Sequence, residues 1–215
     1  MSVNVKRRLD YQPPLYTITN VVMHVQLHAT ATRIKTVSTV QRVGNHNSPL
    51  FLDGEKMQLL SLAVNGEAYN LYSHVEGGIS LTEVPDTFEL TVETEIDPQN
   101  NKALEGLYLS NGVFCTQCEA EGFRRITYFL DRPDVLAKYE VTVSGDKEKY
   151  PTLLANGNPI AKGEESDGTH WVTWQDPHPK PCYLFALVAG DFDLLEDSYT
   201  TTSGPDAKLE FYVDK

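Results

Sequence analysis

The sequence predicts an all-β domain, a sandwich or saddle of many short strands with one or two short helical turns. Three observations indicate this fold class. Apolar and polar residues alternate at period two in several segments, turn dipeptides separate these segments, and no segment carries a long helical pattern. The chain has 215 residues, of which 40% are hydrophobic. This size suits one large β domain or two small ones, and we expect a single domain over 1–215.

Strands and turns account for the first half of the chain. The expected strands are 21–27, 34–41, 59–64, 68–72 and 88–96. Apolar residues occupy every second position of the first strand, and β-branched residues are enriched in the second, which is typical of half-buried strands. Between the third and the fourth, Asn65-Gly66 predicts a tight type I′ turn because both residues tolerate positive φ. The fifth ends at Asp97-Pro98, where proline cannot continue the ladder.

Helical pieces are expected only in 119–139, where Gly122 and Pro133 keep them short. Segment 131–136 is predicted as a helix of one or two turns, with Asp131 as its cap. Strands then resume, interrupted by turns and by the proline-rich segment 177–181. These strands are 139–143, 169–175, 183–188 and 208–213. The last ends just before the chain does, so we expect the sequence to be the front part of a longer protein.

Charge and hydropathy exclude several classes of partner. The 18 Lys and Arg residues against 30 Asp and Glu give a net charge of −12, and no basic run is longer than Lys6-Arg7-Arg8. Such a chain lacks the positive surface that a nucleic-acid binder needs. No apolar run approaches the roughly 20 residues that span a bilayer, and no apolar segment follows the polar start as in a signal peptide. We expect no nucleic-acid or membrane partner and a cytoplasmic location.

The cysteines and histidines form no complete metal or redox motif. Cys115, Cys118 and Cys182 are too few for a disulfide framework, which favours reduced thiols. The first two form a C-x-x-C, but a zinc ribbon needs a second pair and a thioredoxin-like site needs a βαβ pattern, so structural thiols are favoured. His24 and His28 would lie roughly 13 Å apart along a strand, too far apart to bind one zinc.

No complete catalytic motif is present either. The sequence contains no H-E-x-x-H, G-x-S-x-G, P-loop or G-x-G-x-x-G. A polar cluster at 115–125 places an amide, two carboxylates and two guanidiniums in one short segment, and such loops on a β scaffold often bind ligands. The alternative is a solvated loop whose carboxylates pair with Arg124 and Arg125, and spacing alone favours that alternative.

Six segments carry more specific motifs. They are LEGLY at 104–108, CTQCEAEGFRRITY at 115–128, DRPDVLA at 131–137, YPTLLANGN at 150–158, WVTWQDP at 171–177 and KPCYLFALVAGDF at 180–192. Together they closely resemble the N-terminal domain of bacterial aminopeptidase N, a family of zinc-dependent alanyl aminopeptidases in the gluzincin group. The resemblance spans essentially the whole chain. T-Q-x-E and A-G-D-F are its most specific parts, whereas the first hundred residues match mainly in pattern.

The resemblance implies that 1–215 is the non-catalytic N-terminal domain of an enzyme that removes N-terminal amino acids from peptides. Its partners would be the N-terminus of the peptide substrate and the catalytic domain of the same chain. The zinc site of the full-length enzyme would lie beyond Lys215, so the 215-residue chain is expected to bind no zinc and to be inactive alone. Glu119 would bind the substrate α-ammonium group, Gln117 would line the first side-chain subsite, and Glu121 is expected to pair locally.

Two functions of other classes remain open. The chain could be a stand-alone β-sandwich module that binds carbohydrate or protein through Trp171 and Trp174, or a structural interaction domain with an acidic surface. The spacing of three between the tryptophans places them on opposite faces of a strand. A shared stacking platform is therefore not expected, and at least one of the two is expected in the core.

Overall fold

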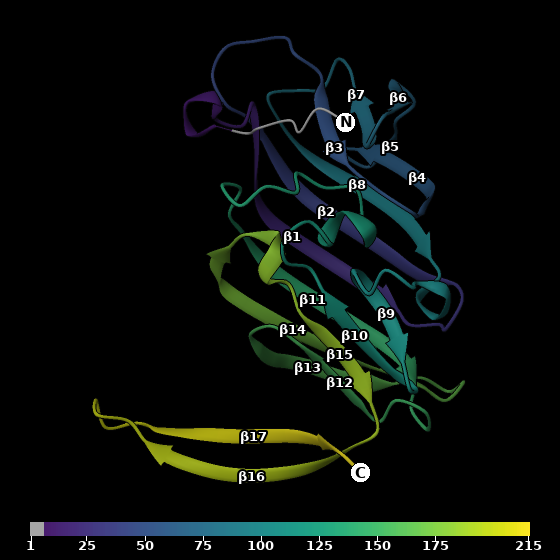
Figure 1. The fold of residues 1–215 in the computed structure, drawn as a ribbon, viewed down its shortest axis with the longest axis vertical. Helices are drawn as coiled ribbons and strands as arrows, with labels where there is room; N and C mark the ends of the chain where they lie inside the picture. The colour runs from purple at the N-terminus through teal and green to yellow at the C-terminus, as the bar shows by residue number, and fades with distance from the viewer. Residues whose placement is uncertain (1–6) are drawn as a thin grey trace.

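The computed structural model describes residues 7–215, and it confirms the all-β prediction (Figure 1). The described chain forms 17 strands, and its only helical segments are four 3-10 turns of three residues each. These turns are η1 (Arg8–Asp10), η2 (Pro98–Asn100), η3 (Phe123–Arg125) and η4 (Cys182–Leu184). No helix of the described chain could cross a membrane, since none has the length and apolar character required.

The main sheet has eight strands in the order β13-β14-β11-β1-β2-β8-β4-β5. They are β1 (Tyr16–Gln26), β2 (Thr32–Arg42), β4 (Gln58–Val64), β5 (Glu67–Ala68), β8 (Thr87–Ile96), β11 (Ala137–Asp146), β13 (Asn158–Glu164) and β14 (Thr169–Lys180). Neighbouring strands of this sheet are antiparallel except β1 and β11, which run parallel. Buried and exposed residues alternate along its central strands, so one face of the sheet packs on the core and the other faces solvent.

Three smaller sheets complete the fold. A four-stranded sheet contains β9 (Gly106–Ser110), β10 (Val113–Gln117), β12 (Thr152–Ala155) and β15 (Leu187–Gly190); a three-stranded sheet contains β3 (Leu50–Asp53), β6 (Tyr72–Val75) and β7 (Gly78–Leu81); and a two-stranded sheet contains β16 (Phe192–Thr200) and β17 (Asp206–Asp214). Figure 1 shows the four-stranded sheet beside β11 and β14, and the three-stranded sheet at the other end near β4 and β8. One hydrophobic core joins these two small sheets to the main sheet.

Phe123 lies at the centre of an aromatic cluster in this core and has no measurable exposure, at 0%. Its ring packs edge-on against Phe129 at 4.9 Å, Phe185 at 5.2 Å and Tyr139 at 6.3 Å between ring centroids. Phe123 is the first residue of η3, so the aromatic cluster fixes the short turn that follows β10.

Most of the predicted strands are confirmed, with small shifts at their ends. The turn at Asn65-Gly66 is confirmed by its φ angles of 52° and 82°, and Asn111-Gly112 repeats this conformation between β9 and β10 with 50° and 83°. Asparagine and glycine tolerate positive φ, so these dipeptides set the two hairpins. The strand expected at 68–72 is wrong beyond Ala68, because β5 pairs with β4 only over Glu67–Ala68.

Three other expectations are wrong. Segment 131–136 forms no helix, because the Asp131 carboxylate accepts hydrogen bonds from Arg124 instead of capping. The strand expected at 183–188 is wrong up to 186, because η4 occupies its start and β15 begins only at Leu187. Segment 177–181 does not interrupt β14, which continues to Lys180. Its prolines are tolerated there because this stretch of β14 has β11 as its one neighbour, so no second ladder needs their missing N–H.

Candidate functional site

The turn 117–122 connects β10 to η3 and carries both predicted site residues. Cys118 is buried, at 3% exposure, and its carbonyl accepts a hydrogen bond from the Gly122 N–H at 2.9 Å. Glu119 is exposed. The Gln117 side-chain amide donates to the Glu119 backbone carbonyl at 3.1 Å. The turn is therefore anchored at its buried ends and presents the Glu119 carboxylate to solvent.

Gly122 lets the turn approach the neighbouring backbone closely. A Cβ at this position would lie 2.3 Å from the Gln117 carbonyl oxygen and 2.9 Å from the Gly106 nitrogen. Both atoms belong to backbone that is fixed in the β9–β10 ladder, where Gln117 and Gly106 are directly paired. Any other residue would push the turn away from the sheet, so glycine sets the position from which Glu119 projects.

Arg124 ties the same turn to the interior through three carboxylates. Its Nε and its backbone N–H donate to Asp131 at 2.8 and 3.1 Å, and its Nη1 lies 3.5 Å from Asp53 and 3.4 Å from Glu121. The Asp131 side chain is 2% exposed, and it also accepts a hydrogen bond from the Cys182 thiol at 3.0 Å. Burial raises the pKa of Asp53, and the Arg124 charge opposes that rise.

Arg125 pairs with two further carboxylates, Glu55 at 3.3 Å and Glu105 at 3.2 Å. Thus five carboxylates around the turn have a guanidinium partner: Asp53, Glu55, Glu105, Glu121 and Asp131. Glu119, on the same turn, forms no ion pair within residues 7–215. The turn thus holds an exposed negative charge that a cationic ligand group can pair with.

Comparisons with known proteins identify the family of this chain. Residues 15–184 match the family described as Peptidase M1 N-terminal domain. The chain belongs to the peptidase M1 N-terminal domain family. It is 51% identical over 98% of its length to aminopeptidase N of Escherichia coli (strain K12), and 49% identical over 100% of its length to aminopeptidase N of Haemophilus influenzae. It covers 24% and 25% of those relatives, so it spans about a quarter of their length.

Solved structures show the same likeness. A crystal structure of Legionella pneumophila aminopeptidase A in complex with aspartic acid is 36% identical, with a TM-score of 0.92 over 97% of this chain and 25% of that chain. A crystal structure of an M1 zinc metallopeptidase from Deinococcus radiodurans shares the fold at 17% identity, with a TM-score of 0.73 over 90% of this chain. The M1 N-terminal domain described here therefore keeps its fold across distant relatives.

The solvated-loop alternative for segment 115–125 holds for one of its two carboxylates. Glu121 pairs with Arg124, as expected, whereas Glu119 does not. The structure brings Gln117 and Glu119 together on one turn of this M1 domain. Their roles in substrate binding stay predictions.

Sequence reasoning missed Asp53, which lies far from the turn in sequence but pairs with Arg124. Asp53 reaches the turn because its backbone N–H donates to the Phe129 carbonyl at 2.8 Å and the Phe129 N–H donates back at 3.0 Å. No local motif indicates such a long-range pairing. Asp131 carried a detectable signal, but its position before Arg132-Pro133 favoured a cap and concealed its burial.

The three thiols of this M1 domain have the features of unreactive, structural cysteines. Cys115, Cys118 and Cys182 are all free. Burial raises the pKa of Cys118 to about 12, and it raises the pKa of Cys182 further still. These thiols stay protonated at neutral pH, which agrees with a structural role.

The zinc that the M1 family implies finds no fitting ligands in this part of the chain. Within residues 7–215, no three His, Cys, Asp or Glu side chains lie close enough together to hold a metal ion. None of these residues is therefore assigned a role in binding zinc.

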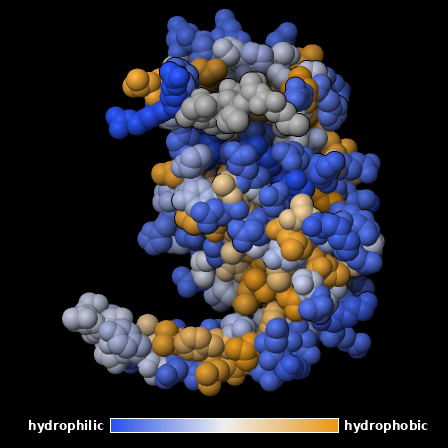
Figure 2. Space-filling model, in the orientation of Figure 1, coloured by the Kyte–Doolittle hydropathy of each residue, from blue (hydrophilic) through white to orange (hydrophobic). Residues whose placement is uncertain are grey.

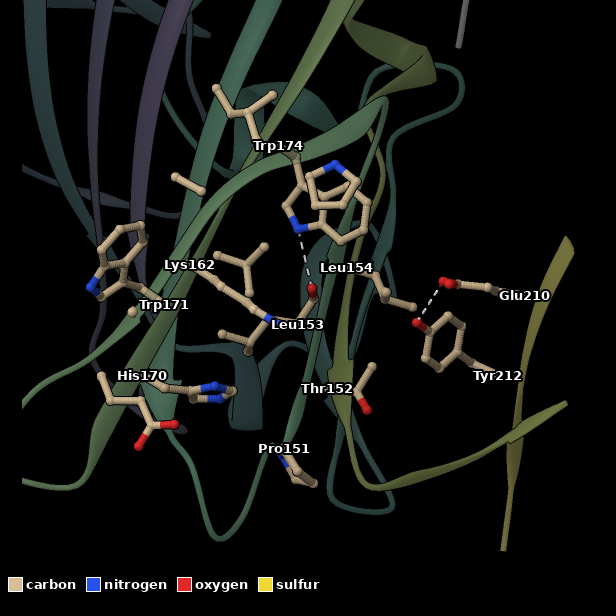
Figure 3. A pocket seen from close by; sticks show the side chains of 16 residues that line it. Pro151, Thr152, Leu153, Leu154, Lys162, His170, Trp171, Trp174, Glu210 and Tyr212 are labelled. Carbon is tan, nitrogen blue, oxygen red and sulfur yellow. Dashed lines mark hydrogen bonds between the residues drawn. The ribbon is translucent and has the colours of Figure 1, made fainter. Parts of the chain in front are cut away.

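A groove of about 790 Å³ lies away from the turn and does not include Gln117 or Glu119 (Figure 3). It lies between β12, β13 and β14 on one side and the Tyr212 side of β17 on the other. Trp174 lines this groove and donates its ring N–H to the Leu153 carbonyl at 3.1 Å. The β14 register places Trp171 opposite Ser144 and Trp174 opposite Val141, on opposite faces of the strand as expected. A stacking platform made of both tryptophans is therefore not supported, although both line the groove. The expectation that at least one of them lies in the core is wrong, because both are only partly buried and both lie outside the core cluster.

Proposed function

We propose that this chain is the N-terminal domain of a zinc aminopeptidase that removes N-terminal amino acids from peptides, and that Glu119 binds the free α-ammonium group of the substrate. The observation that carries the proposal is that the Glu119 carboxylate is exposed and forms no ion pair within residues 7–215, whereas the five carboxylates around it have guanidinium partners. Membership of the M1 N-terminal domain family supports it, as do relatives named aminopeptidase N.

The chemistry of the turn favours a free peptide N-terminus. An ammonium group carries a full positive charge and three N–H donors, so it forms short, charge-assisted hydrogen bonds with a carboxylate. A peptide with a blocked N-terminus offers no such charge. Enclosing Glu119 against it would leave a desolvated carboxylate without a partner, which costs free energy. Glu119 would thereby select for substrates cleaved at their first residue.

The remaining roles follow from the same placement. Gln117 would line the pocket for the first substrate side chain, since its amide lies beside Glu119 and is oriented by the bond to the Glu119 carbonyl. We assign the zinc and the hydrolytic groups to a catalytic domain in the part of the relatives' length that this chain does not cover. In this proposal, residues 1–215 pack on that domain and supply one carboxylate to its substrate pocket.

The test uses the full-length protein and two neighbouring substitutions. Glu119→Gln should lower kcat/KM for an unblocked peptide by about 10- to 100-fold, because a charge-assisted bond is lost. Glu121→Gln is the matched control, since Glu121 lies two residues away on the same turn and pairs with Arg124. An unchanged kcat/KM for Glu119→Gln, or an equal loss in both variants, would contradict the assignment.

Gln117 is tested separately through specificity. Gln117→Ala should change the relative rates for peptides with different first residues while the preference for a free N-terminus over an acetylated one stays the same. A uniform loss for all peptides would exclude Gln117 from the subsite.

A further inference from the structure

The hairpin of β16 and β17, hereafter the arm, pairs with no other strand within residues 7–215. The two strands pair only with each other, from Phe192 opposite Asp214 to Thr200 opposite Asp206. Figure 1 shows the arm extending sideways from the end of the body. It lies outside the family match, which ends at residue 184. A two-stranded hairpin is marginally stable in water by itself, so an arm of this length needs a surface to pack on.

The arm has one apolar face. Its strand register places Leu195 opposite Phe211 and Tyr199 opposite Ala207, with their side chains on the same side. The exposed large apolar residues of this face are Leu195 (63%), Tyr199 (57%), Val213 (50%), Phe211 (49%) and Leu209 (36%). Figure 2 shows apolar atoms gathered along the arm. Single exposed apolar residues are ordinary on a surface, but five of them on one face of a hairpin indicate an interaction site.

The opposite face of the arm is polar in its middle. Lys208 pairs there with Glu196 and, at 2.7 Å, with Glu210, which also accepts a hydrogen bond from Tyr212 at 2.9 Å. Tyr212 and Glu210 line the groove toward the body. The arm is therefore amphipathic, with its ion pairs on one face and most of its exposed large apolar residues on the other.

We infer that the apolar face of the arm is covered by the part of the full-length protein that this chain lacks. This inference rests on the proposed function, in which residues 1–215 are one domain of a longer enzyme. The likeness to the Legionella aminopeptidase A structure covers 97% of this chain, hence most of the arm, and 25% of that chain. Three quarters of such a protein are thus available to pack on the arm. Asp193 and Asp197 share the apolar face, so the covering surface should be apolar with Lys or Arg at its rim.

A second copy of the chain fits this face less well. In a symmetric contact the same patch meets itself, so Asp193 and Asp197 would approach the equivalent carboxylates of the other copy. The net charge of −12 adds further repulsion between two copies. Charge therefore favours a different surface with basic residues.

The test compares two adjacent leucines in the full-length protein. Leu195→Asp places a charge on the apolar face, whereas Leu194→Asp, exposed by 46%, places it on the opposite face of the same strand. Leu195→Asp should lower the thermal midpoint clearly and Leu194→Asp much less. Amides of 192–214 should exchange with deuterium at least about tenfold more slowly in the full-length protein than in the 215-residue chain. If Leu195→Asp prevents folding, Leu195→Ala and the exchange measurement on the unmodified protein replace it.

Three outcomes overturn the inference. The first is equal loss in the two aspartate variants, and the second is equally fast exchange of the arm in both proteins. The third is self-association of the 215-residue chain that Leu195→Asp abolishes, which would assign the face to a second copy. None of these readouts depends on peptidase activity. A failure of the Glu119 assignment, which is read from kcat/KM, is therefore distinguishable from a failure here.

Discussion

Segment 117–125, which comprises the turn 117–122 and η3, and the arm both present side chains to solvent. The rest of the domain makes many side-chain contacts with the first and few with the second. The turn is fixed by partners both near and distant in sequence. Arg124 pairs with Asp131 and with the distant Asp53, and Phe123 packs against Phe129 and the distant Phe185. The arm contacts mainly itself through its own ladder. The comparison shows that contacts within this chain fix the turn that carries Glu119. The arm, in contrast, has an apolar face that no other strand of the described chain covers.

The largest difference should appear when the same residue type is removed from each region. Phe123→Ala should lower the free energy of unfolding by about 3–5 kcal/mol, because it empties the centre of the aromatic cluster. Phe211→Ala in the arm should change it by less than about 0.5 kcal/mol, because Phe211 is 49% exposed. Urea denaturation of the 215-residue chain measures both. Similar losses would show that the arm is packed on the body in solution.

The second test removes a charge from each kind of ion pair. Asp131→Ala should cost about 3 kcal/mol, because it leaves the partly buried Arg124 without its shortest partner and the Cys182 thiol without its acceptor. Asp134→Ala is the control, since Asp134 also pairs with an arginine, Arg132 at 2.7 Å, but near the surface. That change should cost about 1 kcal/mol or less. Equal costs would show that the Arg124 network contributes no more than a surface ion pair.

The sequence predicted the fold class and the regular strands because period-two alternation and Asn-Gly turns are local signals. It failed where a tertiary contact outweighed a local preference. Asp131 had the surroundings of a helix cap, but hydrogen bonds from Arg124 and Cys182 hold its carboxylate in the core. The prolines after Gln175 looked like an interruption, but β14 continues through them because it has a single neighbour there.

The sequence predicted which residues form the candidate site, but not which of their carboxylates form ion pairs. The T-Q-x-E motif identified Gln117 and Glu119 through a resemblance, while spacing alone favoured ordinary pairing with Arg124 and Arg125. Part of the pairing around Arg124 comes from Asp53, which lies on β3, a strand distant in sequence. No window of sequence contains that information, because it arises when the sheets assemble.

A further effect, gradual rather than abrupt, should appear at alkaline pH. Burial raises the pKa of Cys118 to about 12 in the folded chain. In the unfolded chain a cysteine thiol has a pKa of about 8.5. Its contribution to stability is complete below the unfolded pKa and is lost as pH rises toward the folded pKa. The free energy of unfolding should fall by about 1.4 kcal/mol per pH unit over that window because of this thiol. Urea titrations from neutral to alkaline pH should show a shallower slope for Cys118→Ala; an unchanged slope would contradict the burial of a neutral thiol.

The smallest effect on stability is expected at the residue proposed to matter most for binding. Glu119 has no ion-pair partner within the described residues. The five carboxylates around its turn share only two guanidiniums, those of Arg124 and Arg125. Glu119→Gln should therefore leave the free energy of unfolding unchanged or raise it by less than about 0.5 kcal/mol, because repulsion is relieved. Glu121→Gln should lower it by up to about 1 kcal/mol, because the pair with Arg124 is lost.

Thermal midpoints of the two variants at low and high salt measure this difference, since screening removes both effects. A clear loss of stability in Glu119→Gln would mean that the carboxylate serves the fold of the turn. Unchanged stability in Glu119→Gln, together with a lower kcat/KM, would support the proposed role of this carboxylate in binding, because the turn would then fold without it.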